Sequence, residues 1–284
     1  MIVRGSTGDG DHDGGRTLPT VSIEETILGR TPALDDETET YHEASRAYPG
    51  VVDPTIRGAQ LLESSEELRV SATRSTKRHA HAPILELPRP SLDDTTLADA
   101  LSARRSARSF GVAPLTLEQL GTLLGSSYGV SGRFHGHPQT IRTAPSAGAL
   151  YPLELYVVAQ RVEGLDARLV HYDPLRHVLE LLRPVDAGAL DGLTPYSDVV
   201  RECAALIVVT AMFWRSRFKY GARAYRFTLL EAGHVGQNLS LAAAALGVAT
   251  VPLGGFYDRR VDSLLGTDGI HEAAIYLFPV AAMA

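Results

Sequence analysis

Apolar residues recur three and four positions apart in three stretches of the chain. Residues 95–106, 116–129 and 225–247 carry this pattern, which predicts helices with one apolar face. Thr116 is suited to cap the second helix, and Gly247 is suited to end the third. The third predicted helix is unusual because several polar residues lie among its apolar ones.

Other stretches are short, apolar and rich in β-branched residues, which predicts strands. They are residues 153–161, 169–182, 204–213, 248–257 and 272–281. A hairpin turn is expected in the second of them, at Asp173 and Pro174. Because helices and strands do not alternate regularly, the pattern favours an α+β fold over a doubly wound parallel sheet.

Three segments differ in composition. Residues 1–38 are poor in large apolar residues, so we expect a mobile segment. Their DGDHDG stretch begins like a calcium loop, but Thr20 stands where such a loop needs Glu, which favours a linker. Residues 39–90 have a weak pattern and several prolines, which predicts an arm packed on the core. Residues 91–284 are expected to form the main domain.

The chain has 284 residues and a formal net charge of −6, which argues against a nucleic-acid-binding protein. Its one cysteine, Cys203, lies in a predicted strand and is expected to be a buried, unreactive thiol. No signal-peptide pattern is visible, and the longest apolar run, 239–256, is broken by glycine and proline. We therefore expect a cytosolic protein that does not bind membranes.

A basic turn follows the first predicted helix. Arg104, Arg105, Ser106 and Arg108 offer guanidinium groups and a hydroxyl that suit a phosphate and a carbonyl-rich ring. The alternative is a solvated helix end whose positive charge complements the helix dipole.

Two Gly-containing loops are further candidates. Pro145, Ser146, Ala147 and Gly148 form a rigid loop of small residues ahead of a predicted strand, where backbone amides could reach a flat ligand. The alternative is an ordinary connection. After another strand, Leu253, Gly254 and Gly255 permit a backbone conformation that residues with a Cβ resist. Neither loop fits the dinucleotide-binding fingerprint.

No metal site is predicted. The histidines of the HAH stretch at 79–81 and the HGH stretch at 135–137 lie in irregular segments, without carboxylate partners at ligand spacing. We interpret both as surface loops.

In order and spacing these motifs resemble the nitroreductase superfamily of flavin enzymes, and within it the SagB/ThcOx-type azoline dehydrogenases. The resemblance extends from residue 41 to the C-terminus and rests on YHEASR, RRSARSF, PSAGALYPLELYVV, KYGARAYRFTLLEAGHVGQNL and GGF. It implies a nitroreductase-like fold, with a central mixed sheet flanked by helices, in an intertwined homodimer. It also implies one FMN at each of two sites on the dimer interface.

The resemblance implies roles for the candidate residues. Arg104 resembles an arginine on the phosphate side of FMN, Ser106 a ribityl or phosphate contact, and Arg108 a residue near the pyrimidine edge. The 145–148 loop resembles one that reaches the flavin from the partner subunit. Gly254 and Gly255 match a segment whose backbone amide approaches the flavin N5.

Lys219 and Tyr220 match the Lys-Tyr pair to which catalysis is ascribed in the azoline oxidases. Glu231, His234 and Asn238 share one stripe of the helix that follows, which we expect to be a central dimer helix with this stripe toward the cofactor. The alternative is a stripe that satisfies buried backbone groups. A second stripe of small residues is expected to face another helix: Gly233, Gly236, Ser240, Ala244 and Gly247.

The implied activity is FMN-dependent oxidation of thiazoline or oxazoline rings to thiazole or oxazole in a ribosomally made peptide, with oxygen reoxidising the flavin. A lysine amine removes a proton only when it is neutral, a form that desolvation or a neighbouring cation favours. The alternatives are a nitroreductase that uses a nicotinamide donor, and a non-catalytic partner that docks peptide for a cyclodehydratase. One departure from the family is that Ala281 and Ala282 stand where relatives often have a basic residue that binds phosphate.

Overall fold

The computed structural model of the protein describes residues 36–47, 49, 58–68, 76–92, 95–133 and 139–284. Its contacts divide the chain into two units, Met1–Ala47 and Tyr48–Ala284. In the first unit, the Asp36 carboxylate caps helix α2 (Glu37–Ala44) by accepting hydrogen bonds from the backbone N–H groups of Thr38 and Glu39. The DGDHDG stretch lies outside the described residues.

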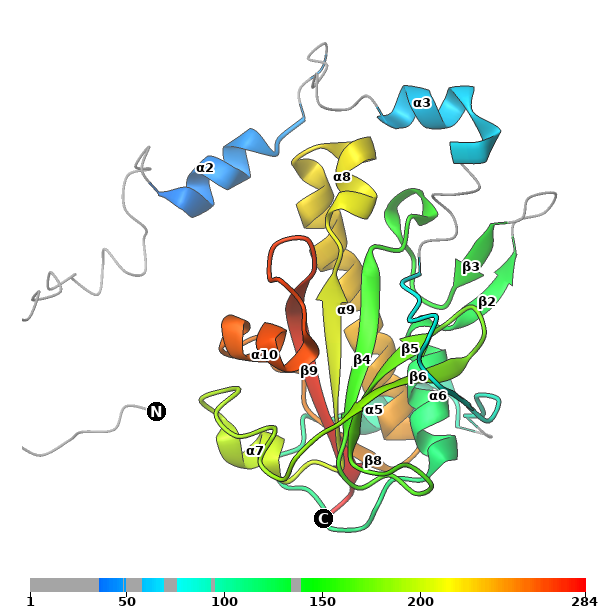
Figure 1. Ribbon diagram of the computed structural model, residues 1–284, viewed down its shortest axis with the longest axis vertical. Coiled ribbons are helices and arrows are strands. Elements are labelled where there is room, and N and C mark those ends of the chain that lie inside the picture. Colours follow the sequence, from blue (N-terminus) through cyan, green and yellow to red (C-terminus); the bar gives the residue numbers. More distant parts are fainter. Residues whose placement is uncertain (1–35, 48, 50–57, 69–75, 93–94, 134–138) are drawn as a thin grey trace, which may run out of the picture. The chain divides into compact units, whose positions relative to one another are not determined.

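A seven-stranded sheet forms the centre of the second unit (Figure 1), in the order β1-β6-β5-β4-β7-β9-β8. The strands are β1 (Ile84–Glu86), β4 (Leu153–Ala159), β5 (Arg168–Asp173), β6 (Val178–Pro184), β7 (Ala205–Ala211), β8 (Val248–Thr250) and β9 (Ala273–Ala282). Neighbouring strands are antiparallel throughout, whereas a mixed sheet was expected. β8 does run parallel to β7, but β9 lies between them and is antiparallel to both.

Different helices cover the two faces of this sheet, because side chains alternate along each strand. On one face, residues such as Val157 pack with α6 (Leu117–Tyr128) and α9 (Arg223–Ala245). On the other face, residues such as Val158 pack with α7 (Ser197–Arg201) and α10 (Asp258–Leu265). Every residue of β4 and β7 is buried, as expected for strands that are covered on both faces.

The remaining described elements lie around this core. They are α3 (Gly58–Ser64), α5 (Leu97–Ala103), the two-stranded sheet of β2 (Val130–Arg133) and β3 (Thr140–Arg142), the 3₁₀ turn η1 (Ala147–Ala149) and α8 (Trp214–Tyr220). Among the described residues no helix combines the length and the apolarity needed to cross a bilayer.

The strongest patterns of the sequence predicted their elements correctly. Thr116 caps α6 in a reciprocal arrangement with Gln119, and the expected hairpin joins β5 to β6. Gly247 follows the end of α9 in the left-handed conformation, with φ 62°. Cys203 is buried, and burial raises the pKa of its thiol to about 12, as expected for an unreactive cysteine. The seven-stranded sheet with helices packed on both faces confirms the α+β fold.

The small residues of α9 do not form one packing surface. A Cβ added to Gly236 would lie 2.8 Å from Cζ of Phe278 and 3.1 Å from Cε1 of Tyr276, so this glycine packs on the aromatic rings of β9. Gly233 is exposed, and a Cβ there would have no neighbour within 4 Å. The expected helix–helix contact is therefore wrong at Gly236, because residues three apart on a helix are rotated by about 60° from one another.

This difference between two glycines of one helix can be measured. Gly236→Ala should destabilise the protein by about 1–3 kcal/mol, since the added methyl overpacks against rings held in a strand. Gly233→Ala should instead be neutral or stabilising by up to ~1 kcal/mol, because alanine favours the helix and meets no neighbour. Urea unfolding of both variants tests this, and equal effects would contradict the packing described at Gly236.

Candidate functional site

Lys219 and Tyr220 end helix α8, immediately before the chain turns into α9. Gly221 makes that turn with φ 55°, in the left-handed region that favours glycine. At the start of α8, Phe213 stacks on Tyr225 of α9, with ring centroids 4.6 Å apart. This stacking fixes α8 against α9, and it therefore also fixes the position of the Lys-Tyr pair at the end of α8. The sequence predicted the pair but not the separate helix that carries it.

The predicted 145–148 loop forms a tight turn at η1. Gly148 has φ 62°, and Ala149 and Tyr151 also have positive φ, at 50° and 47°. Left-handed backbone is costly for residues with a Cβ, so the surrounding contacts must hold this turn in place.

Gly148 lies directly against the Lys-Tyr pair. A Cβ at this position would lie 2.5 Å from Oη of Tyr220 and 2.8 Å from Nζ of Lys219. Glycine thus leaves the room that both side chains occupy. Two motifs that are about seventy residues apart in the sequence meet here, and the amine and the phenol converge on the turn.

Hydrogen bonds to side chains hold the turn. The Ser146 hydroxyl accepts a bond from the Tyr151 backbone N–H at 2.9 Å, and the Tyr151 hydroxyl accepts one from the Arg142 N–H at 3.0 Å. Gln139 donates its side-chain amide to the Ala149 carbonyl at 3.3 Å. The Arg142 guanidinium lies over the Tyr151 ring, 4.6 Å from its centroid. These contacts fix the backbone in its left-handed conformation.

Glu231 lies buried behind the turn, with 2% of its surface exposed. Its Oε1 accepts a hydrogen bond from the Tyr128 hydroxyl at 2.6 Å, and its carboxyl group also interacts with the Ser146 hydroxyl. Burial raises the pKa of Glu231 to about 7, although both hydroxyls act to lower it. A carboxyl group that titrates near neutrality is therefore in contact with the loop.

The other polar residues of α9 are placed differently. Asn238 is half-buried and donates its side-chain amide to the Thr143 carbonyl at 3.3 Å, whereas His234 is exposed. The three residues of the predicted polar stripe therefore lie in different surroundings. Glu231 is buried, His234 is in solvent, and Asn238 contacts the loop region at Thr143.

The basic turn that follows α5 is at the surface. Arg105, Ser106 and Arg108 are exposed, and Arg104 is half-buried. The backbone N–H of Ala107 donates to the Thr250 carbonyl at 2.9 Å, which fixes the turn beside β8. The Arg105 guanidinium turns back onto the carbonyls of Ser102 and Arg104, both at 2.8 Å.

Within one chain this basic turn is distant from the Lys-Tyr pair. β8 pairs with β9 near Val280, which is opposite Ala205 of β7, whereas α8 begins just beyond the other end of β7 at Ala211. Six strand residues at ~3.3 Å each separate the two ends by roughly 20 Å. Figure 1 shows α5 and β8 at the end of the sheet opposite α8.

The segment at 253–255 lies between these two ends. Leu253 forms an isolated antiparallel bridge with Leu277, and Gly255 accepts a hydrogen bond on its carbonyl from the Thr194 hydroxyl at 3.0 Å. Neither Gly254 nor Gly255 has a positive φ, so neither adopts the conformation that the lack of a Cβ permits. Gly254 instead faces open space, where a Cβ would have no neighbour within 4 Å.

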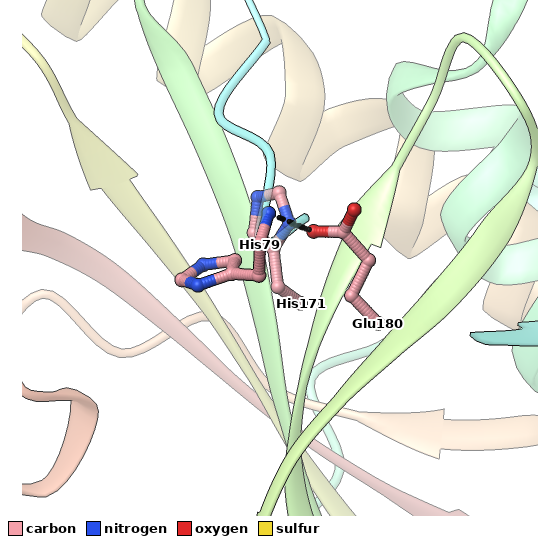
Figure 2. Close-up of side chains that lie close together, drawn as sticks. All are labelled: His79, His171 and Glu180. Atoms are coloured by element: carbon pink, nitrogen blue, oxygen red, sulfur yellow. Dashed lines mark hydrogen bonds and ion pairs between the residues drawn. The ribbon is translucent and has the colours of Figure 1, made fainter. Parts of the chain in front are cut away.

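Sequence reasoning missed a cluster of buried charges in the sheet (Figure 2). The His171 ring lies between two carboxylates, with Nε2 3.0 Å from Oε2 of Glu154 and Nδ1 3.0 Å from Oε2 of Glu180. The pair of His171 and Glu180 is drawn in Figure 2. These residues come from β5, β4 and β6. Burial opposes the charge on His171, but hydrogen bonds to the two carboxylates outweigh it and raise the pKa of the ring to about 9.

His79 completes the group drawn in Figure 2. Its backbone N–H donates to Oε2 of Glu180 at 3.0 Å, and its ring centroid lies 5.2 Å from that of His171. The interpretation of the HAH stretch as a surface loop without carboxylate partners is therefore wrong for His79. The carboxylates come from distant strands, so sequence spacing could not reveal them. The HGH stretch lies outside the described residues.

Further ion pairs extend the cluster in both directions. Nη2 of Arg215, in α8, lies 2.5 Å from Oε1 of Glu154, and Nζ of Lys77 lies 2.6 Å from Oε2 of Glu272. The backbone N–H of Lys77 also donates to Glu154 at 2.6 Å. With Arg176, which pairs with both Asp173 and Glu180, the cluster contains four carboxylates and four cations.

Possible ligand atoms of His79, His171 and Glu180 lie within 4.8 Å of one another, close enough to suggest a metal ion. A protonated imidazole, however, has no free lone pair, and both nitrogens of His171 already face carboxylates. We therefore interpret this group as a charge-balanced ion network.

The chain matches the family model "Nitroreductase family" over residues 101–281. It is 34% identical over 197 residues to MJ1384 of Methanocaldococcus jannaschii, a protein named as a nitroreductase, and the match covers 69% of this chain and 96% of that one. A structure from Ralstonia eutropha, also named as a nitroreductase, superposes with a TM-score of 0.61 at 29% identity, covering 71% of this chain and 90% of that one. The protein belongs to the nitroreductase family.

Two relatives are named for peptide processing. The chain is 30% identical over 133 residues to the microcin B17-processing protein McbC of Escherichia coli, covering 45% of this chain and 49% of McbC. It is 30% identical over 146 residues to the trifolitoxin-processing protein TfxB of Rhizobium leguminosarum, covering 49% and 39%. One chain in the structure of the E. coli microcin synthetase complex McbBCD has the same fold, with a TM-score of 0.57 at 22% identity, covering 86% of this chain and 86% of that one.

The charge on His171 predicts a pH dependence of stability. Its pKa of about 9 lies above the value of 6.5 for an ordinary histidine, so its contribution is complete below pH 6.5 and is lost as the pH rises through 9. The shift corresponds to about 3 kcal/mol. Urea unfolding between pH 6 and pH 10 should show this decline in the wild type.

His171→Gln should be less stable than the wild type at pH 6 and should lack this component of the decline. His271→Gln, at an exposed histidine, should follow the wild type. Parallel curves for the wild type and His171→Gln would contradict a charged ring between Glu154 and Glu180.

Proposed function

We propose that this protein is an FMN-dependent dehydrogenase that oxidises thiazoline or oxazoline rings in a ribosomally made peptide. One observation carries the proposal: Nζ of Lys219 and Oη of Tyr220 converge on Gly148. The amine and the phenol thus stand at the turn that is proposed to contact the cofactor, where a proton would have to leave the ring. The names of McbC and TfxB as peptide-processing proteins support a peptide substrate.

The residues of the chain fit a flavin mononucleotide. Arg104, Arg105 and Arg108 offer guanidinium groups and Ser106 a hydroxyl, a donor set that suits a single phosphate. Gly148 is exposed, which leaves the turn beside Lys219 and Tyr220 accessible to a flat ring. Bound FMN would supply the two-electron oxidation that no amino-acid side chain can perform.

The separation of the two half-sites supports a homodimer. Roughly 20 Å of sheet lies between the basic turn beside β8 and the turn at Gly148, which is more than one flavin ring can span. The basic turn of one subunit and the Gly148 turn of its partner together would form one complete site. The homodimer is thus part of the proposal.

Lys219 and Tyr220 have distinct roles in the proposed reaction. The Lys219 amine, when neutral, takes the proton from the ring carbon that becomes part of the aromatic heterocycle. The Tyr220 hydroxyl can donate a hydrogen bond to the ring heteroatom or to the peptide carbonyl and so hold the ring in place. A cyclodehydratase that forms the azoline would be the natural partner in the same assembly.

A second candidate is a flavin oxidoreductase that reduces a small molecule with a nicotinamide donor. The match to MJ1384 over 96% of that protein favours it. Turnover of an azoline peptide without added nicotinamide would separate the two, because the dehydrogenase takes its electrons from the peptide itself.

Substituting Lys219 tests the proposed base. Lys219→Ala should keep the dimer and the flavin spectrum but lose ring oxidation by about 10²–10⁴-fold, the usual contribution of general acid–base catalysis. Arginine at this position should not restore activity, because a guanidinium group does not release its proton in a protein. The mass loss of two hydrogens per ring is the measurement.

Arg217→Ala is the matched control, because Arg217 lies on the same helix with its guanidinium over the Trp214 ring. It should retain ring oxidation. Reduction of a small electrophile requires no ring proton to be removed, so it should survive in Lys219→Ala. If both activities fall together, Lys219 supports the flavin site and is not the base.

The basic turn predicts which flavin is bound. The purified protein should release FMN and not FAD, since the turn offers one phosphate site. Arg104→Ala should lower FMN retention by roughly 10–100-fold, as expected when a charge-assisted contact of ~1.5–3 kcal/mol is lost. Arg201→Ala, at an exposed ion pair with Asp191, should retain it. Unchanged retention in Arg104→Ala would place the phosphate elsewhere.

A further inference from the structure

Two backbone N–H groups beyond the Gly148 turn are connected to one buried carboxyl group through hydroxyls. The Tyr151 N–H donates to the Ser146 hydroxyl at 2.9 Å, and that hydroxyl lies close enough to Glu231 to lower the pKa of its carboxyl group. The Leu153 N–H donates to the Tyr128 hydroxyl at 3.4 Å, and that hydroxyl donates to Oε1 of Glu231 at 2.6 Å. Both paths end on the same side chain of α9.

The direction of these bonds follows from the chemistry of the groups. A backbone N–H can only donate, so each hydroxyl accepts from the backbone and has its own proton free to donate onward. An ionised carboxylate only accepts, and it can take both protons. The ionised form of Glu231 therefore satisfies every donor in the two paths at once.

We propose that Glu231 is a positioning residue whose ionised carboxylate, acting through Ser146 and Tyr128, fixes the segment 146–153 in its left-handed turn. Protonation of Glu231 would release that segment. The role goes beyond contact with a cofactor, since Glu231 lies behind the turn with 2% of its surface exposed.

Protonation of Glu231 breaks one of the hydrogen-bond paths that fix the segment. A neutral carboxyl group becomes a donor on one oxygen, and the hydroxyl that it faces already accepts from the backbone. That hydroxyl would then receive two protons and have no acceptor for its own. A buried donor without a partner is costly, so one of the two paths must open.

The groups that face Glu231 place this change near neutrality. Burial raises its pKa to about 7, while the hydroxyls of Ser146 and Tyr128 and the positive charge of Arg142 act in the opposite direction. Burial also raises the pKa of Tyr128 and of Tyr151, so both phenols stay protonated across this range. Tyr276 of β9, near the same helix at Gly236, also has a raised pKa.

If the segment contacts FMN, as the proposed function holds, its release would weaken cofactor binding as the pH falls through about 7. This consequence rests on the proposed function. The positioning role itself concerns only the chain's own residues and can be measured without flavin.

Amide hydrogen exchange of the full-length protein at pH 6 and pH 8, corrected for the intrinsic effect of pH on exchange, tests the positioning role. Protection of the amides in 147–153 should be about five- to tenfold lower at pH 6, the effect of losing one hydrogen bond. The buried strand β7 should show no such difference and is the internal reference.

Glu231→Gln should show low protection of this segment at both pH values, because glutamine replaces one acceptor oxygen with an NH2 donor, as protonation does, and it does not titrate. Ser146→Ala keeps the carboxyl group and removes one path, so it should lower protection at Tyr151 at pH 8 and tests the role if Glu231→Gln does not fold. Ser240→Ala is the control, since this buried serine of α9 donates to the Gly236 carbonyl. Equal protection of the segment at both pH values in the wild type would overturn the proposal.

Flavin retention measured over the same pH range separates this inference from the proposed function. Two results together would support both the positioning role and the proposed function. In the wild type, flavin retention falls with amide protection as the pH is lowered, and in Glu231→Gln flavin retention is low at every pH. A segment that responds to pH in a protein that binds no flavin would leave the positioning role standing and would overturn the proposed function. If the protein binds flavin but the amide protection of the segment does not change with pH, only the role of Glu231 is overturned.

Discussion

The buried carboxylate of Glu154 connects three parts of the molecule that are distant in sequence. It pairs with Arg215 of α8, with His171 of β5 and with the backbone N–H of Lys77. Removing one partner of a buried ion pair leaves a charge without compensation, typically at a cost of about 3–5 kcal/mol. Because Arg215 lies on the same short helix as Lys219, this carboxylate helps to fix the position of the proposed base, together with the stacking of Phe213 on Tyr225.

The parts of the fold that the sequence predicted are those with a long periodic pattern. The regions around α6 and α9 show leucines and alanines at helical spacing, and β4 and β7 are apolar runs interrupted only by Glu154 and Thr210. Helix α8 is too short for a period to stand out, and it owes its place to the stacking of Phe213 on Tyr225 and to Arg215. Such contacts between distant residues leave no local signal.

In the candidate site, too, the local motifs could be predicted from the sequence, whereas the contacts between distant residues could not. Its loops and the Lys-Tyr pair are visible as motifs, but their meeting at Gly148 depends on the path of β4, β7 and α8. The charge cluster does leave one signal in the sequence. Glu154, His171 and Glu180 each stand within a predicted strand, where a charged group has to find a partner among other strands. The sequence shows the need for a partner but not which residue meets it.

The distance of roughly 20 Å between the basic turn and the Gly148 turn also has a thermodynamic consequence. If each cofactor site is completed by two subunits, assembly and cofactor binding are linked by mass action. The apparent affinity for the cofactor then rises with protein concentration, and the cofactor in turn strengthens the association of subunits by the same free energy. A dilute cell extract and a concentrated preparation of this protein would then differ in their content of holoenzyme, although the chain is the same in both.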